Sequence, residues 1–170
     1  MLSDMDRIAR LWDGVPTLGL MLSTVKVEIK GDVPPVSLPN LEKGLKEGSV
    51  VDLPFWLAEI LRDEGFAELR DLDLSTELFK ALSRERLQGE FQLSTLDPLF
   101  LTRLRRELKR GGPLAVRYKD LVTIRAGKVT RLAGLMPGSE GPKEKMGLEE
   151  RMLFSFISEA VGRWKEVMRV

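Results

Sequence analysis

The chain has 170 residues, with 27 basic and 26 acidic side chains, and it contains neither cysteine nor histidine. Its length suits one ordinary domain, or a domain with a small appendage, and 43% hydrophobic residues with 31% charged residues indicate a folded protein. Without Cys or His the chain has no disulfide, thiolate nucleophile or imidazole base, so only oxygen ligands could hold a metal, which would favour Mg²⁺ or Ca²⁺.

The near balance of charge predicts no general attraction to nucleic acid or to an anionic membrane. Residues 1–14, MLSDMDRIARLWDG, carry charges throughout and do not resemble a signal peptide. No apolar run approaches the roughly 18 residues of a membrane span. We therefore expect an intracellular protein that has no membrane partner.

The first part of the chain has the pattern of a small β-rich domain. In TVKVEIK, residues 24–30, apolar β-branched residues alternate with charged ones, which predicts a half-buried strand. TLGLML, residues 17–22, could supply a partner strand, and residues 49–51 a further short one. Three prolines between residues 34 and 39 exclude a helix there. We predict a small β-rich domain over residues 1–52.

From Pro54 onward the pattern is helical, and we predict an α-helical bundle domain over residues 53–170. Pro54 suits the first turn of a helix, where Asp52 could accept free N–H groups, and Gly65 is a plausible stop. The inward face of this helix is predicted to contain Trp56, Leu57, Ile60 and Leu61.

Three further helices are expected. Ser75 is a candidate cap for the first, in which Leu78, Phe79 and Leu82 would lie on one side. The second would begin near Ser94 or Thr95, with Pro98 in its first turn, and end at Gly111 and Gly112. The last, in residues 147–170, carries a sustained apolar stripe at helical spacing. Its members are Leu148, Met152, Leu153, Phe156, Ile157, Ala160, Val161, Trp164, Val167 and Met168.

Residues 119–135, KDLVTIRAGKVTRLAGL, allow two interpretations. β-Branched residues on both sides of Ala126-Gly127-Lys128 favour a hairpin. A helix with Leu121, Ile124, Lys128 and Leu132 on one face is the alternative, and Gly127 would cost it about 1 kcal/mol. Local propensity alone favours the hairpin. Residues 136–147 are expected to connect to the last helix.

The motifs that could carry chemistry are weak. The carboxylate pairs Asp71 with Asp73 and Glu149 with Glu150 lie beside predicted helix starts, where capping explains acidic residues better than catalysis does. Gly127-Lys128 lacks the first glycine and the Ser or Thr of a phosphate-binding loop. We therefore predict no catalytic, cofactor-binding or metal-binding residue, although an enzyme with carboxylate-held Mg²⁺ remains a third hypothesis.

Two sets of residues are candidates for interactions with other molecules. The basic segment RLRRELKR, residues 103–110, could make weak contacts with DNA phosphates, although cations at a helix end also complement its dipole. Its candidate residues are Arg103, Arg105, Arg106, Lys109 and Arg110. Large apolar residues could pack in the chain's own core or against a second subunit. These are Phe55, Trp56, Leu57, Phe100, Phe154, Phe156, Ile157 and Trp164.

The order of these segments, and the stretch GSVVDLPFWLAEILRDEG in residues 48–65, resemble the GINS family of replication proteins. In that family an apolar and acidic strand end runs into Pro, a bulky residue, Trp, Leu and Ala, as residues 51–58 do. DLSTELFKALSRERLQGEFQLSTLDPLFLTRLRREL, residues 73–108, is similar to the next family helices. The resemblance covers residues 20–110 and extends to the last helix. It is to the archaeal type with the small β domain first, similar to the second and third Psf subunits of eukaryotes.

The resemblance implies an α+β protein in which a small B-type domain precedes a helical A-type domain, with residues 119–135 as a long helix. It implies a non-catalytic scaffold in DNA replication, without cofactors. Its partners would be a subunit of reverse domain order, in a hetero-tetramer with two copies of each, together with the MCM helicase and a RecJ-like or Cdc-type protein. Its location would be an archaeal replisome at the nucleoid. A nucleic-acid-binding adaptor that uses the basic segment is the alternative function.

Overall fold

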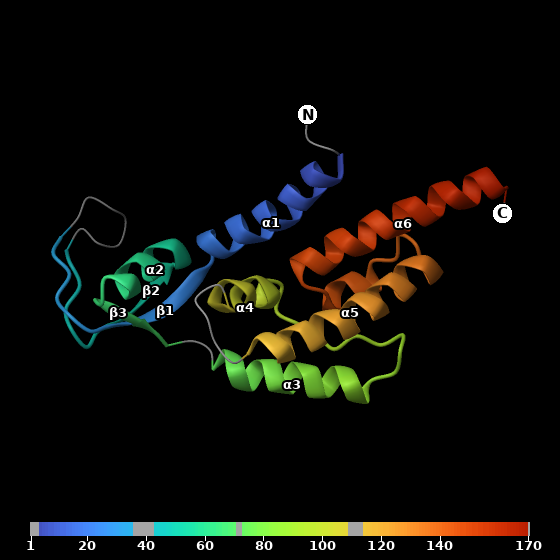
Figure 1. The fold of residues 1–170 in the computed structure, drawn as a ribbon. Helices are drawn as coiled ribbons and strands as arrows, with labels where there is room; N and C mark the ends of the chain where they lie inside the picture. The colour runs from blue at the N-terminus through green and yellow to red at the C-terminus, as the bar shows by residue number, and fades with distance from the viewer. Residues whose placement is uncertain (1–3, 36–42, 71–72, 109–113, 170) are drawn as a thin grey trace. The chain divides into compact units, whose positions relative to one another are not determined.

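The computed structural model describes residues 4–35, 43–70, 73–108 and 114–169 (Figure 1). Contacts divide the chain into two units. Thr17–Asp73 form one, which we call the sheet unit, and Met1–Pro16 with Leu74–Val170 form the other, the helical unit. The first helix, α1 (Asp4–Leu22), crosses this division at Pro16. The chain is therefore an α+β protein, as its sequence predicts.

The sheet unit contains a three-stranded antiparallel sheet in the order β2-β1-β3. Its central strand is β1 (Thr24–Ile29), flanked by β2 (Val50–Pro54) and by β3 (Ala67–Leu69). The alternating residues Val25, Val27 and Ile29 are buried, which confirms the predicted half-buried strand. Leu53 pairs with Val25 in the register of β1 and β2, so the buried residues of the two strands lie side by side.

The partner strand expected at residues 17–22 is wrong, because these residues form the last turns of α1. A six-residue apolar run fits a helix as well as a strand, and Leu and Met are strong helix formers. The true neighbours of β1 come from residues 50–54 and 67–69. The second of these strands is too short to show a period-two pattern in the sequence.

Helix α2 (Phe55–Asp63) begins immediately after β2, with Pro54 at its N-cap. Asp52 lies in β2 and no side chain caps the helix, so the predicted capping role of Asp52 is wrong. The N–H of Phe55 instead donates to the carbonyl oxygen of Ser23 at 2.8 Å. Gly65, at a φ of 81°, follows the end of the helix as predicted. Ile60, predicted to face inward, is exposed.

The division between the units does not coincide with the boundary expected after residue 52. Helix α2 packs against all three strands, and β3 follows it in the chain. Both elements therefore belong to the sheet unit, which extends to Asp73.

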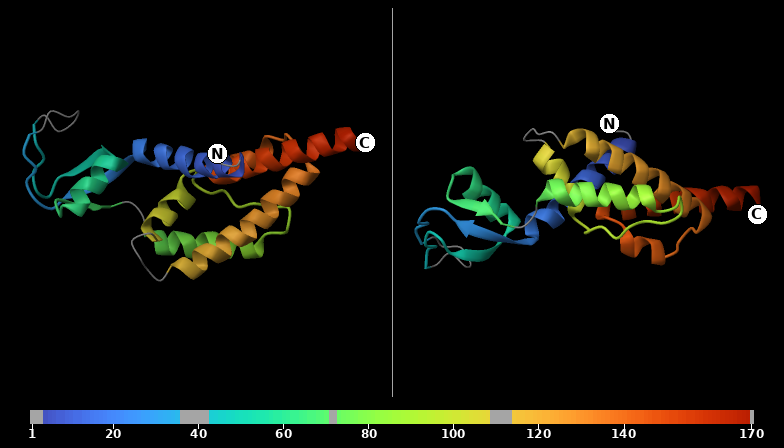
Figure 2. Two further views of the ribbon diagram at one scale, coloured as in Figure 1. Left: turned by 45° about the horizontal axis from the view of Figure 1, so that its top comes forward. Right: turned by 90° about the horizontal axis from the view of Figure 1, so that it is seen from below.

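The helical unit is built around one long helix, α5 (Ala115–Leu135), which packs beside both α3 (Leu74–Leu87) and α6 (Leu148–Met168) (Figure 1 and Figure 2). A short helix α4 (Phe100–Leu108) and a 3-10 turn η1 (Gly141–Lys145) complete the described elements. One apolar cluster joins α3, α4 and α5, and a second joins α5 to Met146 and Phe154.

Several predicted helix boundaries in this unit need correction. Ser75 lies inside α3 rather than capping it. The helix expected from Ser94 or Thr95 begins only at Phe100, after a turn in which the Asp97 carboxylate accepts the N–H of Leu99 at 2.9 Å. Leu78 and Leu82 are buried as predicted, whereas Phe79 is exposed. The expected stop at Gly111 and Gly112 lies outside the described residues.

Residues 119–135 are helical, so the hairpin that local propensity favours is wrong and the helix implied by the family resemblance is confirmed. Of the predicted helical face, Leu121, Lys128 and Leu132 are buried and Ile124 is half-buried. Within the described ranges, no helix combines the length and the apolarity that a membrane span requires.

Candidate functional site

A cluster of four charged side chains is buried inside the helical unit. Arg125, on α5, is fully buried, and its Nε and Nη2 donate to the two carboxylate oxygens of Glu150 at 2.6 and 2.8 Å. Nη1 donates to Glu85 and to the carbonyl oxygen of Ser94, and Nη2 also donates to that of Lys145. The five N–H donors of this guanidinium therefore have five acceptors.

Glu85, on α3, is the acidic centre of the cluster. Besides Arg125, it accepts the backbone N–H and the hydroxyl of Ser94 through Oε1, while Oε2 faces Lys128. Burial raises the pKa of Glu85, but the hydrogen bonds from Lys128 and Ser94 and the charge of Arg125 outweigh burial and hold the pKa below its ordinary value.

Lys128, one helical turn after Arg125, links α5 to the end of α3. Its Nζ donates to Glu85 Oε2 and to the Glu85 carbonyl oxygen, both at 2.8 Å, and to the carbonyl oxygen of Gln92 at 2.9 Å. The last carbonyls of a helix lack partners in the helix, and a cation satisfies them well. Lys128 thus stabilises the end of α3 and the loop beyond it.

This cluster is balanced, with two cations and two carboxylates, and its donors are used within the protein. A general acid or base needs a proton-transfer partner within reach, and these groups already hold each other. We therefore assign the cluster a structural role, that of joining α3, α5 and α6. Glu150 also accepts the N–H of Gly147 at 2.9 Å, in agreement with the capping interpretation of this acidic pair.

The sequence analysis missed this cluster because Arg, Lys and Glu are almost always exposed. Its only signal was the spacing of Arg125 and Lys128, which places both on the apolar side of a helix that also holds Leu121 and Leu132. Interpreting residues 119–135 as a hairpin removes that signal.

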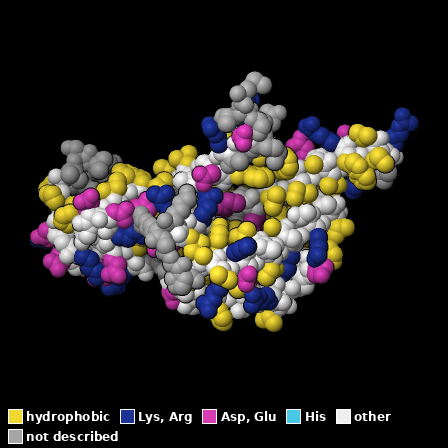
Figure 3. Space-filling model, viewed as in Figure 1, with side chains coloured by type: hydrophobic (Ala, Val, Ile, Leu, Met, Phe, Trp, Pro, Cys, Tyr) yellow, Lys and Arg dark blue, Asp and Glu magenta, His cyan; other side chains and the backbone are white. Residues whose placement is uncertain are grey.

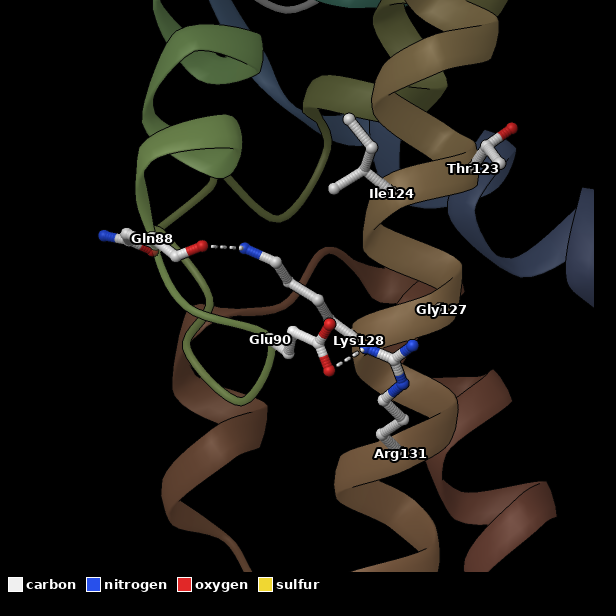
Figure 4. A pocket seen from close by; sticks show the side chains of 7 residues that line it. All are labelled: Gln88, Glu90, Thr123, Ile124, Gly127, Lys128 and Arg131. Carbon is white, nitrogen blue, oxygen red and sulfur yellow. Dashed lines mark hydrogen bonds and ion pairs between the residues drawn. The ribbon is translucent and has the colours of Figure 1, made fainter.

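A pocket of about 300 Å³ lies beside the cluster (Figure 4). Lys128 crosses it from α5 toward the carbonyl oxygen of Gln88, and Arg131 pairs with Glu90 at 2.7 Å. Each charged group of this pocket is therefore paired, Arg131 with Glu90 and Lys128 with Glu85 of the buried cluster. Its full lining is Gln88, Glu90, Thr123, Ile124, Gly127, Lys128 and Arg131.

The large apolar residues for which the sequence left core and interface open fall into two groups. Four are buried within their own units: Phe55 and Leu57 in α2, Phe100 in α4 and Phe154 in α6. Trp56 and Ile157 are half-buried. Phe156 and Trp164 are 41% and 59% exposed.

Helix α6 packs within its unit partly through residues outside the predicted apolar stripe. Its buried residues are Glu150, Phe154 and Ser158, none of which belongs to the predicted stripe. The stripe members Leu153 and Ile157 are half-buried against the same core. The part of that stripe that stays exposed is Phe156, Ala160, Trp164, Val167 and Met168, which we call the α6 apolar row. Figure 3 shows apolar side chains gathered toward the C-terminal end of this helix.

The basic segment is only partly described. Arg103, Arg105 and Arg106 are half-buried on α4, and Arg105 pairs with Asp13 of α1 at 2.9 Å. Lys109 and Arg110 lie outside the described residues. The weak DNA contact expected of these residues stays a prediction.

No protein-family model matches the chain, and no curated protein sequence matches it. Among the described residues, no three acidic side chains lie together in a way that could hold a metal ion. The α6 apolar row is an exposed group of large apolar side chains, which is typical of a surface that contacts another protein.

Proposed function

We propose that this protein is a non-catalytic assembly subunit of the GINS type, which scaffolds the MCM replicative helicase and a RecJ-like or Cdc-type protein during DNA replication. The observation that carries the proposal is the α6 apolar row. Trp164 is 59% exposed, Val167 78% and Met168 54%, and they share the last turns of one helix. Large apolar side chains grouped on one surface mark protein interfaces.

Trp164, Val167 and Met168 of the row do not belong to the core that holds α6 in place. Helix α6 is fixed by Phe154, which is fully buried, and by Glu150, which binds Arg125. Within the row, Phe156 contacts Trp12, whereas Trp164, Val167 and Met168 are exposed and are left for another chain. Tryptophan is among the residues that contribute most to binding when an interface covers them.

The arrangement of the chain supports the same proposal. A small antiparallel sheet, with Pro54, Phe55, Trp56 and Leu57 at the start of α2, comes before helices α3 to α6. The resemblance of this segment to the GINS family suggests a partner subunit of reverse domain order, with two copies of each chain. Holding other proteins in a fixed arrangement is then the mechanism, and MCM would supply the ATP hydrolysis.

Co-expression with a partner subunit of the reverse domain order tests the proposal. Size-exclusion chromatography with light scattering should show a stable complex of four chains. Trp164→Ser should weaken this complex at least tenfold, because truncating a central interface Trp costs about 2 kcal/mol or more. A chain that stays monomeric with the partner present, and does not bind MCM, would contradict the proposal.

Leu87→Ser is the matched control for this experiment. Leu87 is 87% exposed at the end of α3, in the same unit but on another helix. Both substitutions remove an exposed apolar side chain. Only the one in the α6 apolar row should affect assembly, and equal effects would show general loss of solubility instead.

A further inference from the structure

A second pocket, of about 270 Å³, lies in the helical unit where α1, α4, α5 and α6 meet. Its wall is mostly apolar. Trp12 and Tyr118 contribute aromatic rings from α1 and α5, and Val122 and Leu153 contribute aliphatic side chains from α5 and α6. Pockets that bind small molecules typically have this composition, with a few polar groups that fix the orientation of the ligand.

The charges around this pocket are not balanced. Arg105, on its rim, pairs with Asp13, and Glu150 pairs with Arg125. In the described part of the chain, Glu149 pairs with no cation. Its Oε1 accepts the hydroxyl of Thr102, and its Oε2 is buried without a hydrogen-bond partner. One negative charge thus remains uncompensated beside an apolar, aromatic wall.

Tyr118 reports on the same environment. Burial raises the pKa of its phenol, Arg105 opposes this rise, and the negative charge of Glu149 adds to it. The phenol therefore stays neutral and lies within electrostatic reach of both charged groups. Its ring, together with that of Trp12, offers faces that attract cations.

We propose that this pocket binds a small organic cation, a primary ammonium attached to an aromatic or aliphatic body. The body would replace water against Trp12, Val122 and Leu153, and the ammonium would offset the charge of the Glu149 carboxylate through space, because Oε2 itself is buried. The volume lies just below the range of drug-sized sites, so the ligand is correspondingly small. This site does not depend on the proposed assembly role.

Titration of the full-length, ¹⁵N-labelled chain with 2-phenylethylammonium tests the proposal, with 2-phenylethanol as the neutral probe of similar shape. Amide resonances around residues 118–126 and 149–153 should shift with the ammonium. The ammonium should bind about tenfold more tightly than the alcohol, because the unpaired charge of Glu149 attracts a cation in this partly desolvated pocket. Added salt should weaken only the ammonium.

Three variants separate the charge of the pocket from its shape. Glu149→Gln keeps an acceptor for Thr102 and should weaken the ammonium about tenfold while leaving the alcohol unchanged. Ala126→Leu adds bulk to the lining and should block both probes. Glu166→Gln, at an exposed position of α6, the helix that also holds Glu149, should leave the binding of both probes unchanged. Circular dichroism confirms that each variant is folded.

Three results would overturn the proposal: no shifted resonances with the ammonium, equal affinity for both probes in the wild-type chain, or unchanged ammonium binding by Glu149→Gln. The comparison of the affinities for the two probes uses only the wild-type chain, so it tests the proposal even if a variant does not fold.

Discussion

Lys128 Nζ lies 2.8 Å from Glu85 Oε2, and both side chains are buried between α5 and α3. The pair is part of a balanced cluster that also contains Arg125 and Glu150. Removing one member of such a cluster leaves an uncompensated buried charge. We therefore expect a substitution of one charged residue of this cluster to destabilise the folded protein.

Glu85→Gln should lower the free energy of unfolding by about 3 to 5 kcal/mol, because it leaves Arg125 and Lys128 with one carboxylate fewer. Glu90→Gln is the matched control, since Glu90 also pairs with a cation of α5, Arg131, but at the surface. The control should cost about 1 kcal/mol or less. Urea denaturation measures both, and equal losses would contradict the buried cluster.

The carboxylate of Glu85 also makes the stability of the protein depend on pH. The pKa of Glu85 is lower in the folded chain than in the unfolded chain, so the unfolded chain binds its proton first as the pH falls. The stability that Glu85 provides is present above pH 4.5 or so and is lost as the pH falls through the folded pKa. Denaturation measured from neutral to acidic pH should show this loss, and Glu85→Gln should reduce the slope.

Tyr118 should titrate above its ordinary value of 10.0, because burial disfavours the phenolate. It is the only tyrosine in the chain, so the ultraviolet absorbance of phenolate reports it directly. The pH dependence of stability is opposite to that caused by Glu85. The stability that Tyr118 provides is fully present below the pKa of the unfolded chain and is lost as the pH rises through the pKa of the folded chain. Titration at or below the ordinary value would show that the ring is not buried as described.

Two glycines should respond oppositely to alanine. Gly127 lies inside α5 with open space where a Cβ would stand, so Gly127→Ala should stabilise the protein by about 1 kcal/mol. Gly65 has a φ of 81°, and Gly65→Ala should cost about 1 kcal/mol or more. Thermal unfolding measures both. A loss of stability with Gly127→Ala would argue against the helix at residues 119–135.

Two phenylalanines of α6 are separated by one residue and should differ in their effect on stability. Phe154 is fully buried, and Phe154→Ala should cost about 3 to 5 kcal/mol. Phe156 is 41% exposed and packs edge-to-face on Trp12, with the two ring centroids 6.0 Å apart. Phe156→Ala should therefore lower the free energy of unfolding by about 1 kcal/mol. Denaturation of the isolated chain tests this, and a larger loss at Phe156 would assign the α6 apolar row to the core.

The sequence by itself determined the elements whose patterns are local. The alternation in residues 24–30 predicted β1, and the helical spacing after Gly147 predicted α6, because each repeats over enough residues to be recognised. Pro54 and Gly65 correctly marked the two ends of α2, since their backbone preferences need no tertiary partner.

Only the tertiary structure decided the features that depend on distant partners. Residues 119–135 favour a hairpin locally, yet they form α5, where Arg125 and Lys128 bind Glu85 and Glu150 from two other helices. It also decided which face of α6 is buried, because Phe154 packs against α5 while Trp164 does not enter the core. Packing and charge compensation between helices outweigh local preferences of about 1 kcal/mol or less per residue.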